Sequence, residues 1–106
     1  MNPRDRAAKH ATVIEVTRET GADLLVFEVV VREGRGESRH RVTMTLAMCE
    51  RLAGSQHTAE ACIEAAFRFL LDREPKESIL ARFDLSVIQR YFPDFERELP
   101  RYLAAA

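Results

Sequence analysis

The chain has 106 residues, 46% hydrophobic and 31% charged, and its 16 basic and 17 acidic side chains give a net charge of −1. This length suits a single domain. The charge balance argues against a nucleic-acid or membrane-surface binder, because such proteins usually carry a basic excess. No apolar run reaches the roughly 20 residues of a membrane helix. Two cysteines outside any disulfide framework indicate a reduced, cytoplasmic protein.

The first half of the chain predicts a small antiparallel sheet. We expect residues 1–10 to form a flexible arm and residues 11–106 to form one α+β domain. After the arm, apolar and polar side chains alternate, as in half-buried strands. The predicted strands span residues 11–18, 23–32 and 37–45, and they form a three-stranded meander with the second strand in the centre.

Two tight turns set the predicted registers. A two-residue turn at Gly34 and Arg35 places Phe27 opposite Val42. A turn at Thr20 and Gly21 places Ile14 opposite Phe27. Both registers bury one apolar face, since alternate side chains point the same way. That face comprises Ile14, Val16, Leu25, Phe27, Val29, Val31, Val42 and Met44.

The second half of the chain predicts four to five short helices that cover one face of the sheet. Residues 46–52 form the first helix, and Gly54 terminates it. Residues 59–73 form the longest, with Thr58 as the N-cap and Pro75 as the stop. Three further short segments are predicted as helices at residues 76–83, 85–92 and 94–103.

Part of this half is similar to a helix-turn-helix. The sequence ILARFDLS (79–86) matches the first helix and turn of that unit, but Arg90 and Pro93 stand where apolar anchors are expected. Proline would cut the recognition helix short. A nucleic-acid-associated regulatory role, through residues 78–92 or through the arginines of the strand hairpin, is therefore the alternative function.

The residues predict no catalytic, cofactor-binding or metal-binding site. The spacing of Cys49, His57 and Cys62 matches no compact zinc pattern, and Cys62 falls on an apolar helix face. An enzyme is accordingly the third-ranked hypothesis. No cofactor is expected.

The outward face of the predicted sheet is the candidate interaction surface. It carries an apolar stripe rimmed by polar and basic side chains, which is typical of surfaces that bind partner proteins. The candidate residues are Leu24, Val26, Val30, Arg35, Arg39, Arg41 and Thr43. We expect a non-enzymatic protein-interaction domain that binds another protein or a second copy of itself.

One long stretch supports a family resemblance. Residues 67–96, FRFLLDREPKESILARFDLSVIQRYFPDFE, resemble a segment of small bacterial proteins of similar length that have no assigned function. The resemblance covers about a third of the chain and implies no activity.

Overall fold

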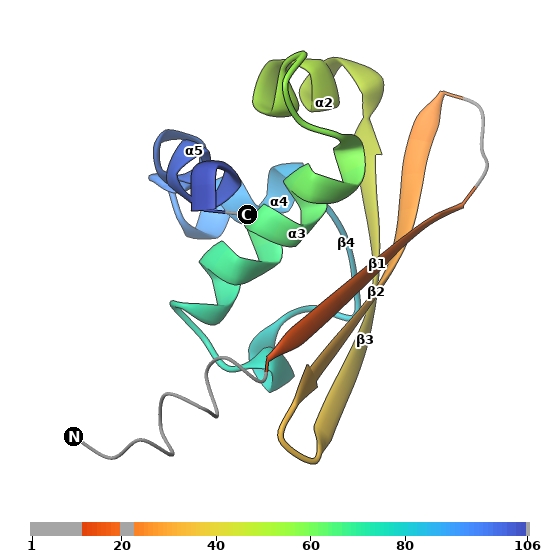
Figure 1. Cartoon of the computed structure of the whole chain (residues 1–106), viewed down its shortest axis with the longest axis vertical. Helices are drawn as coiled ribbons and strands as arrows, with labels where there is room; N and C mark the ends of the chain where they lie inside the picture. Colours follow the sequence, from red (N-terminus) through yellow and green to blue (C-terminus); the bar gives the residue numbers. More distant parts are fainter. Residues whose placement is uncertain (1–11, 20–22, 106) are drawn as a thin grey trace.

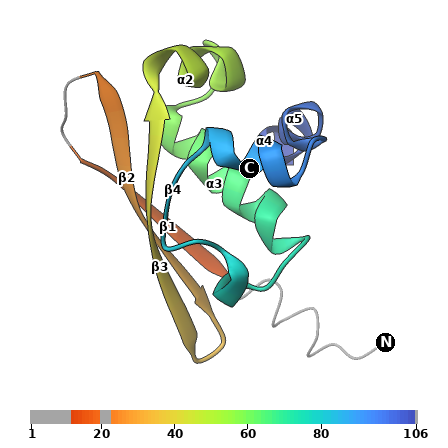
Figure 2. The same ribbon diagram turned by 180° about the vertical axis from the view of Figure 1, so that it is seen from behind.

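The computed structural model describes residues 12–19 and 23–105, and the predicted arm at residues 1–10 lies outside this range. In the described part, an α+β fold places one sheet beside a layer of helices (Figures 1 and 2). The strands are β1 (Val13–Glu19), β2 (Leu24–Glu33), β3 (Gly36–Thr45) and β4 (Arg82–Asp84). The helices are α2 (Leu46–Ala53), α3 (Ala59–Leu71), the 3₁₀ helix η1 (Lys76–Ser78), α4 (Ser86–Tyr91) and α5 (Phe95–Ala105).

The hairpin of β2 and β3 has the predicted register. Phe27 lies opposite Val42, and Glu28 lies opposite Arg41. Gly34 adopts a φ of 60° at the turn, a left-handed conformation that glycine takes without steric cost. Arg35 has no positive φ, so only the first central residue is left-handed, as a type II′ turn requires.

The predicted register of β1 against β2 is wrong. Ile14 lies opposite Val31, not opposite Phe27, and β1 pairs only as far as Glu19 opposite Val26. The connection is therefore longer than the predicted two-residue turn, and residues 20–22 within it lie outside the described range. The shift is an even number of residues, so it leaves the same side chains on the buried face. The alternating pattern specified the face but not the register.

The sheet has a fourth strand where the sequence predicted a helix. Residues 82–84 run parallel to β3, and the Arg41 amide donates to the Ala81 carbonyl oxygen at 2.7 Å. The Leu85 amide donates to the Thr43 carbonyl oxygen at 2.8 Å. The segment around Ala81 is made of good helix formers, but pairing with the open edge of β3 outweighs that weak local preference. Residues 78–92 accordingly form a strand and one helix, not a helix-turn-helix.

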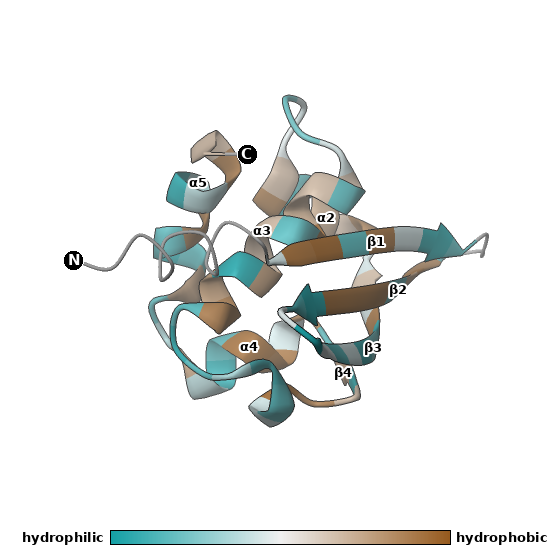
Figure 3. Cartoon of the chain, turned by 60° about the horizontal axis from the view of Figure 1, so that its bottom comes forward, coloured by the Kyte–Doolittle hydropathy of each residue, from teal (hydrophilic) through white to brown (hydrophobic). Residues whose placement is uncertain are grey.

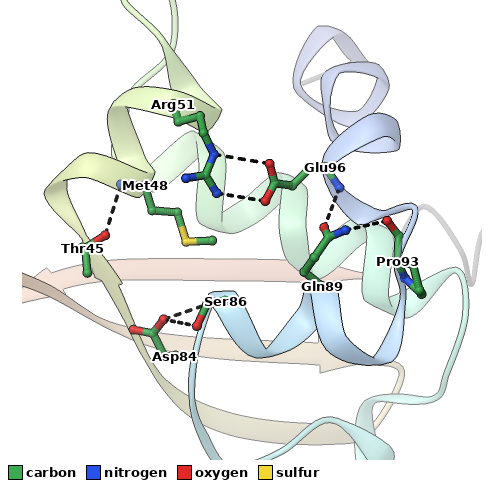
Figure 4. A network of polar contacts seen from close by, with 8 residues as sticks. All are labelled: Thr45, Met48, Arg51, Asp84, Ser86, Gln89, Pro93 and Glu96. Carbon is green, nitrogen blue, oxygen red and sulfur yellow. Dashed lines mark hydrogen bonds and ion pairs between the residues drawn. The ribbon is translucent and has the colours of Figure 1, made fainter.

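Helix α3 starts at the predicted cap, and α2 starts at a cap of the same kind that was not predicted. The Thr58 hydroxyl accepts from the Ala61 amide at 3.0 Å at the start of α3. The Thr45 hydroxyl accepts from the Met48 amide at 3.1 Å at the start of α2 (Figure 4). Such caps satisfy amides that have no partner within the helix. Gly54 ends α2 with a φ of 63°, as predicted.

Helix α3 is buried on two sides, which explains its nearly continuous apolar sequence. Towards the sheet, the Phe67 ring lies 5.3 Å from the His40 ring and 6.0 Å from the Phe83 ring. On another side, Phe69 packs its ring edge-to-face against rings of α5 and the segment before it. Both phenylalanines are fully buried.

A polar network links the helices to one another (Figure 4). Arg51 of α2 forms an ion pair with Glu96 of α5 at 2.9 Å. The Glu96 amide donates to the side chain of Gln89 in α4, which in turn donates to the Pro93 carbonyl oxygen at 2.6 Å. These contacts tie three short helices together. None of the described helices combines the length and apolarity needed to cross a membrane.

Candidate functional sites: the outer sheet face and an apolar pocket

The outward-pointing side chains of the sheet form a surface that no described helix covers. In Figures 1 and 2, helices α2 to α5 all lie on the same side of the sheet. We call the opposite side the outer face. Of the candidate residues, Leu24 is 42% exposed, and Val26 and Val30 are half-buried. In Figure 3 most of β2 has the brown colour of hydrophobic residues, and its C-terminal end is hydrophilic.

The strand register orders the outer face into columns. Val26 lies beside Thr43 of β3, and Val30 lies beside Arg39. On the other side, Glu15 lies beside Val30 and Glu19 beside Val26. The β2 column is therefore apolar at Leu24, Val26 and Val30 but also carries Glu28 and Arg32. The β1 column contributes Glu15 and Glu19, and the β3 column contributes Arg39 and Arg41 together with Glu37.

Ion pairs link the columns of the outer face. Arg41 contacts Glu19 and Glu28, both at 2.7 Å. Arg32 pairs with Glu15 and Glu37. These side chains are about 40–50% exposed, so each pair stabilises the fold only slightly.

Two of the candidate residues are not available on the outer face. Arg35 lies in the β2–β3 turn, at the end of the sheet instead of on its face. The Thr43 hydroxyl donates to the carboxylate of Asp84 in β4 at 2.6 Å, so its proton is already used in a hydrogen bond within the sheet. The remaining residues, Leu24, Val26, Val30, Arg39 and Arg41, are brought together. The observed β1 strand adds Glu19, beside Val26, to this surface, because the predicted strand ended at residue 18.

A second feature, an apolar pocket, was not predicted. It has a volume of about 320 Å³ and lies between α3, the loop after η1, β4 and α4. Three aromatic rings line it, those of Phe83, Tyr91 and Phe92. Leu80 and Tyr91 are 50% and 69% exposed at its wall, so the pocket opens to solvent.

The carboxylate of Glu74 is the one acidic group among the residues lining this pocket. Glu74 follows α3, and its amide donates to the Leu70 carbonyl oxygen at 2.9 Å. Burial raises the pKa of the Glu74 carboxyl above its usual value, and no cation in the described part of the chain offsets this cost.

Two buried polar side chains hold the pocket's outer loop against the sheet. The His40 Nδ1 lies 2.8 Å from the Leu80 carbonyl oxygen, and its Nε2 lies 2.8 Å from the Ser38 hydroxyl. A carbonyl only accepts, so Nδ1 donates and Nε2 accepts from the hydroxyl. The Lys76 ammonium lies 2.6 Å from Glu77 and 3.8 Å from Glu33 of the hairpin.

The two cysteines lie at the α2–α3 contact and not at either site. Cys62 is buried, and desolvation raises the pKa of its thiol to about 12. The thiolate is the nucleophilic form, so this side chain serves as core packing. Among residues 12–19 and 23–105, no three His, Cys, Asp or Glu side chains gather as metal ligands would.

Comparison with known proteins identifies no relative. No protein-family model, curated protein or solved structure matches the chain at a significant level. The resemblance of residues 67–96 to uncharacterised bacterial proteins therefore stays a prediction, as does the cytoplasmic location.

Proposed function

We propose that this protein is a non-enzymatic interaction domain that associates with a second copy of itself through the outer face. The observation that carries this proposal is the order of residues across the face: Glu15 and Glu19 on β1, apolar Leu24, Val26 and Val30 on β2, and Arg39 and Arg41 on β3. Exposed apolar residues with a polar rim are typical of partner surfaces.

The order of the columns favours a self-complementary contact. Two copies can pack face to face around a two-fold axis that runs parallel to β2. This operation superposes the β1 column of one copy on the β3 column of the other, and the β2 columns on each other. Glu15, Val30 and Arg39 share one row of the sheet, so Glu15 of each copy would face Arg39 of the other. Isologous contacts of this kind are the commonest in protein dimers.

The size of the face sets the expected affinity. Three strands spaced about 4.8 Å apart and about 30 Å long give a footprint of about 400–500 Å². This area is below the roughly 800 Å² per partner of a standard stable interface. We therefore expect a weak dimer with a dissociation constant of about 10–500 µM.

Val26→Lys tests the apolar column. The lysine would place a charge at the centre of the contact, and we expect sedimentation equilibrium to show at least tenfold weaker association. In the folded monomer the new ammonium can reach Glu19, the row neighbour of Val26, so the fold should persist by circular dichroism.

Leu46→Lys is the matched control, because Leu46 is 50% exposed at the start of α2, on another part of the surface. It should associate like the wild type. A wild type that stays monomeric at millimolar concentration, or a Val26→Lys variant that dimerises normally, would refute the proposal.

A further inference from the structure

The apolar pocket contains the chemistry for recognising an organic cation. Its lining combines the rings of Phe83, Tyr91 and Phe92 with the carboxylate of Glu74. The faces of aromatic rings attract cations, and the combination of aromatic rings with a carboxylate is suited to ammonium groups on apolar bodies. The volume of about 320 Å³ falls at the lower end of the range of small-molecule sites.

No basic side chain among the described residues pairs with the Glu74 carboxylate, whereas two other acidic side chains of this region have such a partner. Asp94 pairs with Arg73 at 2.6 Å, and Glu77 pairs with Lys76 at 2.6 Å. In contrast, the pKa of Glu74 is raised by desolvation alone. A half-buried carboxylate without a counter-ion costs free energy, and a cationic ligand would supply the missing charge.

The exposed wall of the pocket is a second reason to expect a ligand with an apolar body. Leu80 and Tyr91 are among the few large hydrophobic side chains that the described residues expose to solvent, and both line this pocket. A ligand with an apolar body would cover them and gain hydrophobic free energy in proportion to the area removed from water.

From the volume, the aromatic lining and the single carboxylate, we propose that this pocket binds a small organic ammonium compound. The ammonium group would lie beside the Glu74 carboxylate, and the apolar body would lie against Phe83, Tyr91 and Phe92. The site is separate from the outer face, so this binding does not depend on self-association.

Three probes with one phenyl body test the proposal: 2-phenylethylamine, 2-phenylethanol and 3-phenylpropanoate. They are cationic, neutral and anionic at pH 7. Titration followed by ¹H–¹⁵N NMR should shift the amides of residues 74, 79–83 and 88–92. We expect the amine to bind at least tenfold more tightly than the alcohol, and the anion to bind least.

Two variants assign the interaction to the pocket. Glu74→Gln should abolish the preference for the amine over the alcohol while both still bind. Tyr91→Ala should weaken both. Glu50→Gln, which removes an exposed carboxylate of α2 outside the pocket, should behave like the wild type. Equal affinity for the three probes, shifts at other residues, or no binding at about 10 mM amine would overturn the proposal.

Discussion

At the scale of single residues, polar side chains in apolar surroundings distinguish this protein most clearly. His40 is 3% exposed, and each of its ring nitrogens has a hydrogen-bond partner. No buried side-chain nitrogen or oxygen atom of the described residues is left without a hydrogen-bond partner. Glu74 differs because burial without a cation raises its pKa. Ionised Glu74 thus lowers stability, a property common among functional residues.

The pH dependence of stability tests this assessment of Glu74. Its pKa is higher in the folded than in the unfolded state, so the free energy of unfolding falls as the pH rises from the unfolded-state pKa to the folded-state pKa and stays lower above it. Glu74→Gln removes this cost, and the variant should melt at a higher temperature than the wild type at pH 7.

The gain should disappear below about pH 4, where the carboxyl is protonated in both states. Thermal melts of both proteins across this pH range measure the effect. A variant that is less stable than the wild type at pH 7 would show that the carboxylate has a structural partner.

At the scale of elements, the connection between β4 and α4 attaches the second half of the chain to the sheet. Asp84 accepts from the Thr43 hydroxyl at 2.6 Å. Its other oxygen accepts from the Ser86 hydroxyl at 2.7 Å (Figure 4). The Ser86 amide donates to the same carboxylate at 3.1 Å. One carboxylate thus joins β3 to the strand beside it and to the start of the following helix.

Asp84→Ala should lower the free energy of unfolding by about 1–3 kcal/mol at pH 7, because it removes several hydrogen bonds to a charged group. Burial opposes ionisation of this carboxyl, but the hydrogen bonds from Thr43 and Ser86 prevail and lower the pKa of Asp84.

A lowered pKa means that the stabilisation is present above the unfolded-state pKa and is lost as the pH falls through the folded-state pKa. Urea melts at several pH values should therefore show the two proteins converging in acid. Asp23→Ala, at an exposed position before β2, is the control. A loss as small as that of the control would contradict the role of Asp84.

The elements differ in how well the sequence predicts them. The β2–β3 register follows from a glycine turn together with charge and apolar pairs, such as Glu28 with Arg41, that all agree. The β1–β2 register does not follow, because registers that differ by an even shift bury the same face. Strand β4 was missed because a strand of three residues is too short to show an alternating pattern, and it forms only by pairing with the edge of β3. The pocket was missed with it, since Phe83 reaches the pocket only from that strand.

At the scale of the whole molecule, the helices leave one face of the sheet open. Helix α3 lies between the sheet and α5, and Phe69 is buried by the rings around α5. The C-terminal helix therefore packs on α3 and does not fold over the outer face (Figure 1). The candidate residues Val26 and Val30 accordingly remain accessible to a partner on that side.

The central claim, self-association through the outer face, is tested most directly by mixing two charge variants. Arg39→Glu would place two acidic residues together at each Glu15–Arg39 contact, and Glu15→Lys would place two basic ones there. Each variant alone should sediment as a monomer at a concentration at which the wild type dimerises.

An equimolar mixture of the two variants should restore the dimer. One of its two contacts would set the introduced lysine of one copy against the introduced glutamate of the other, and the second contact would be the native pair. Sedimentation velocity of the mixture is the decisive measurement: the proposal predicts a dimer boundary that neither variant forms alone. If the mixture sediments as a monomer while the wild type dimerises, the two copies do not meet in this arrangement.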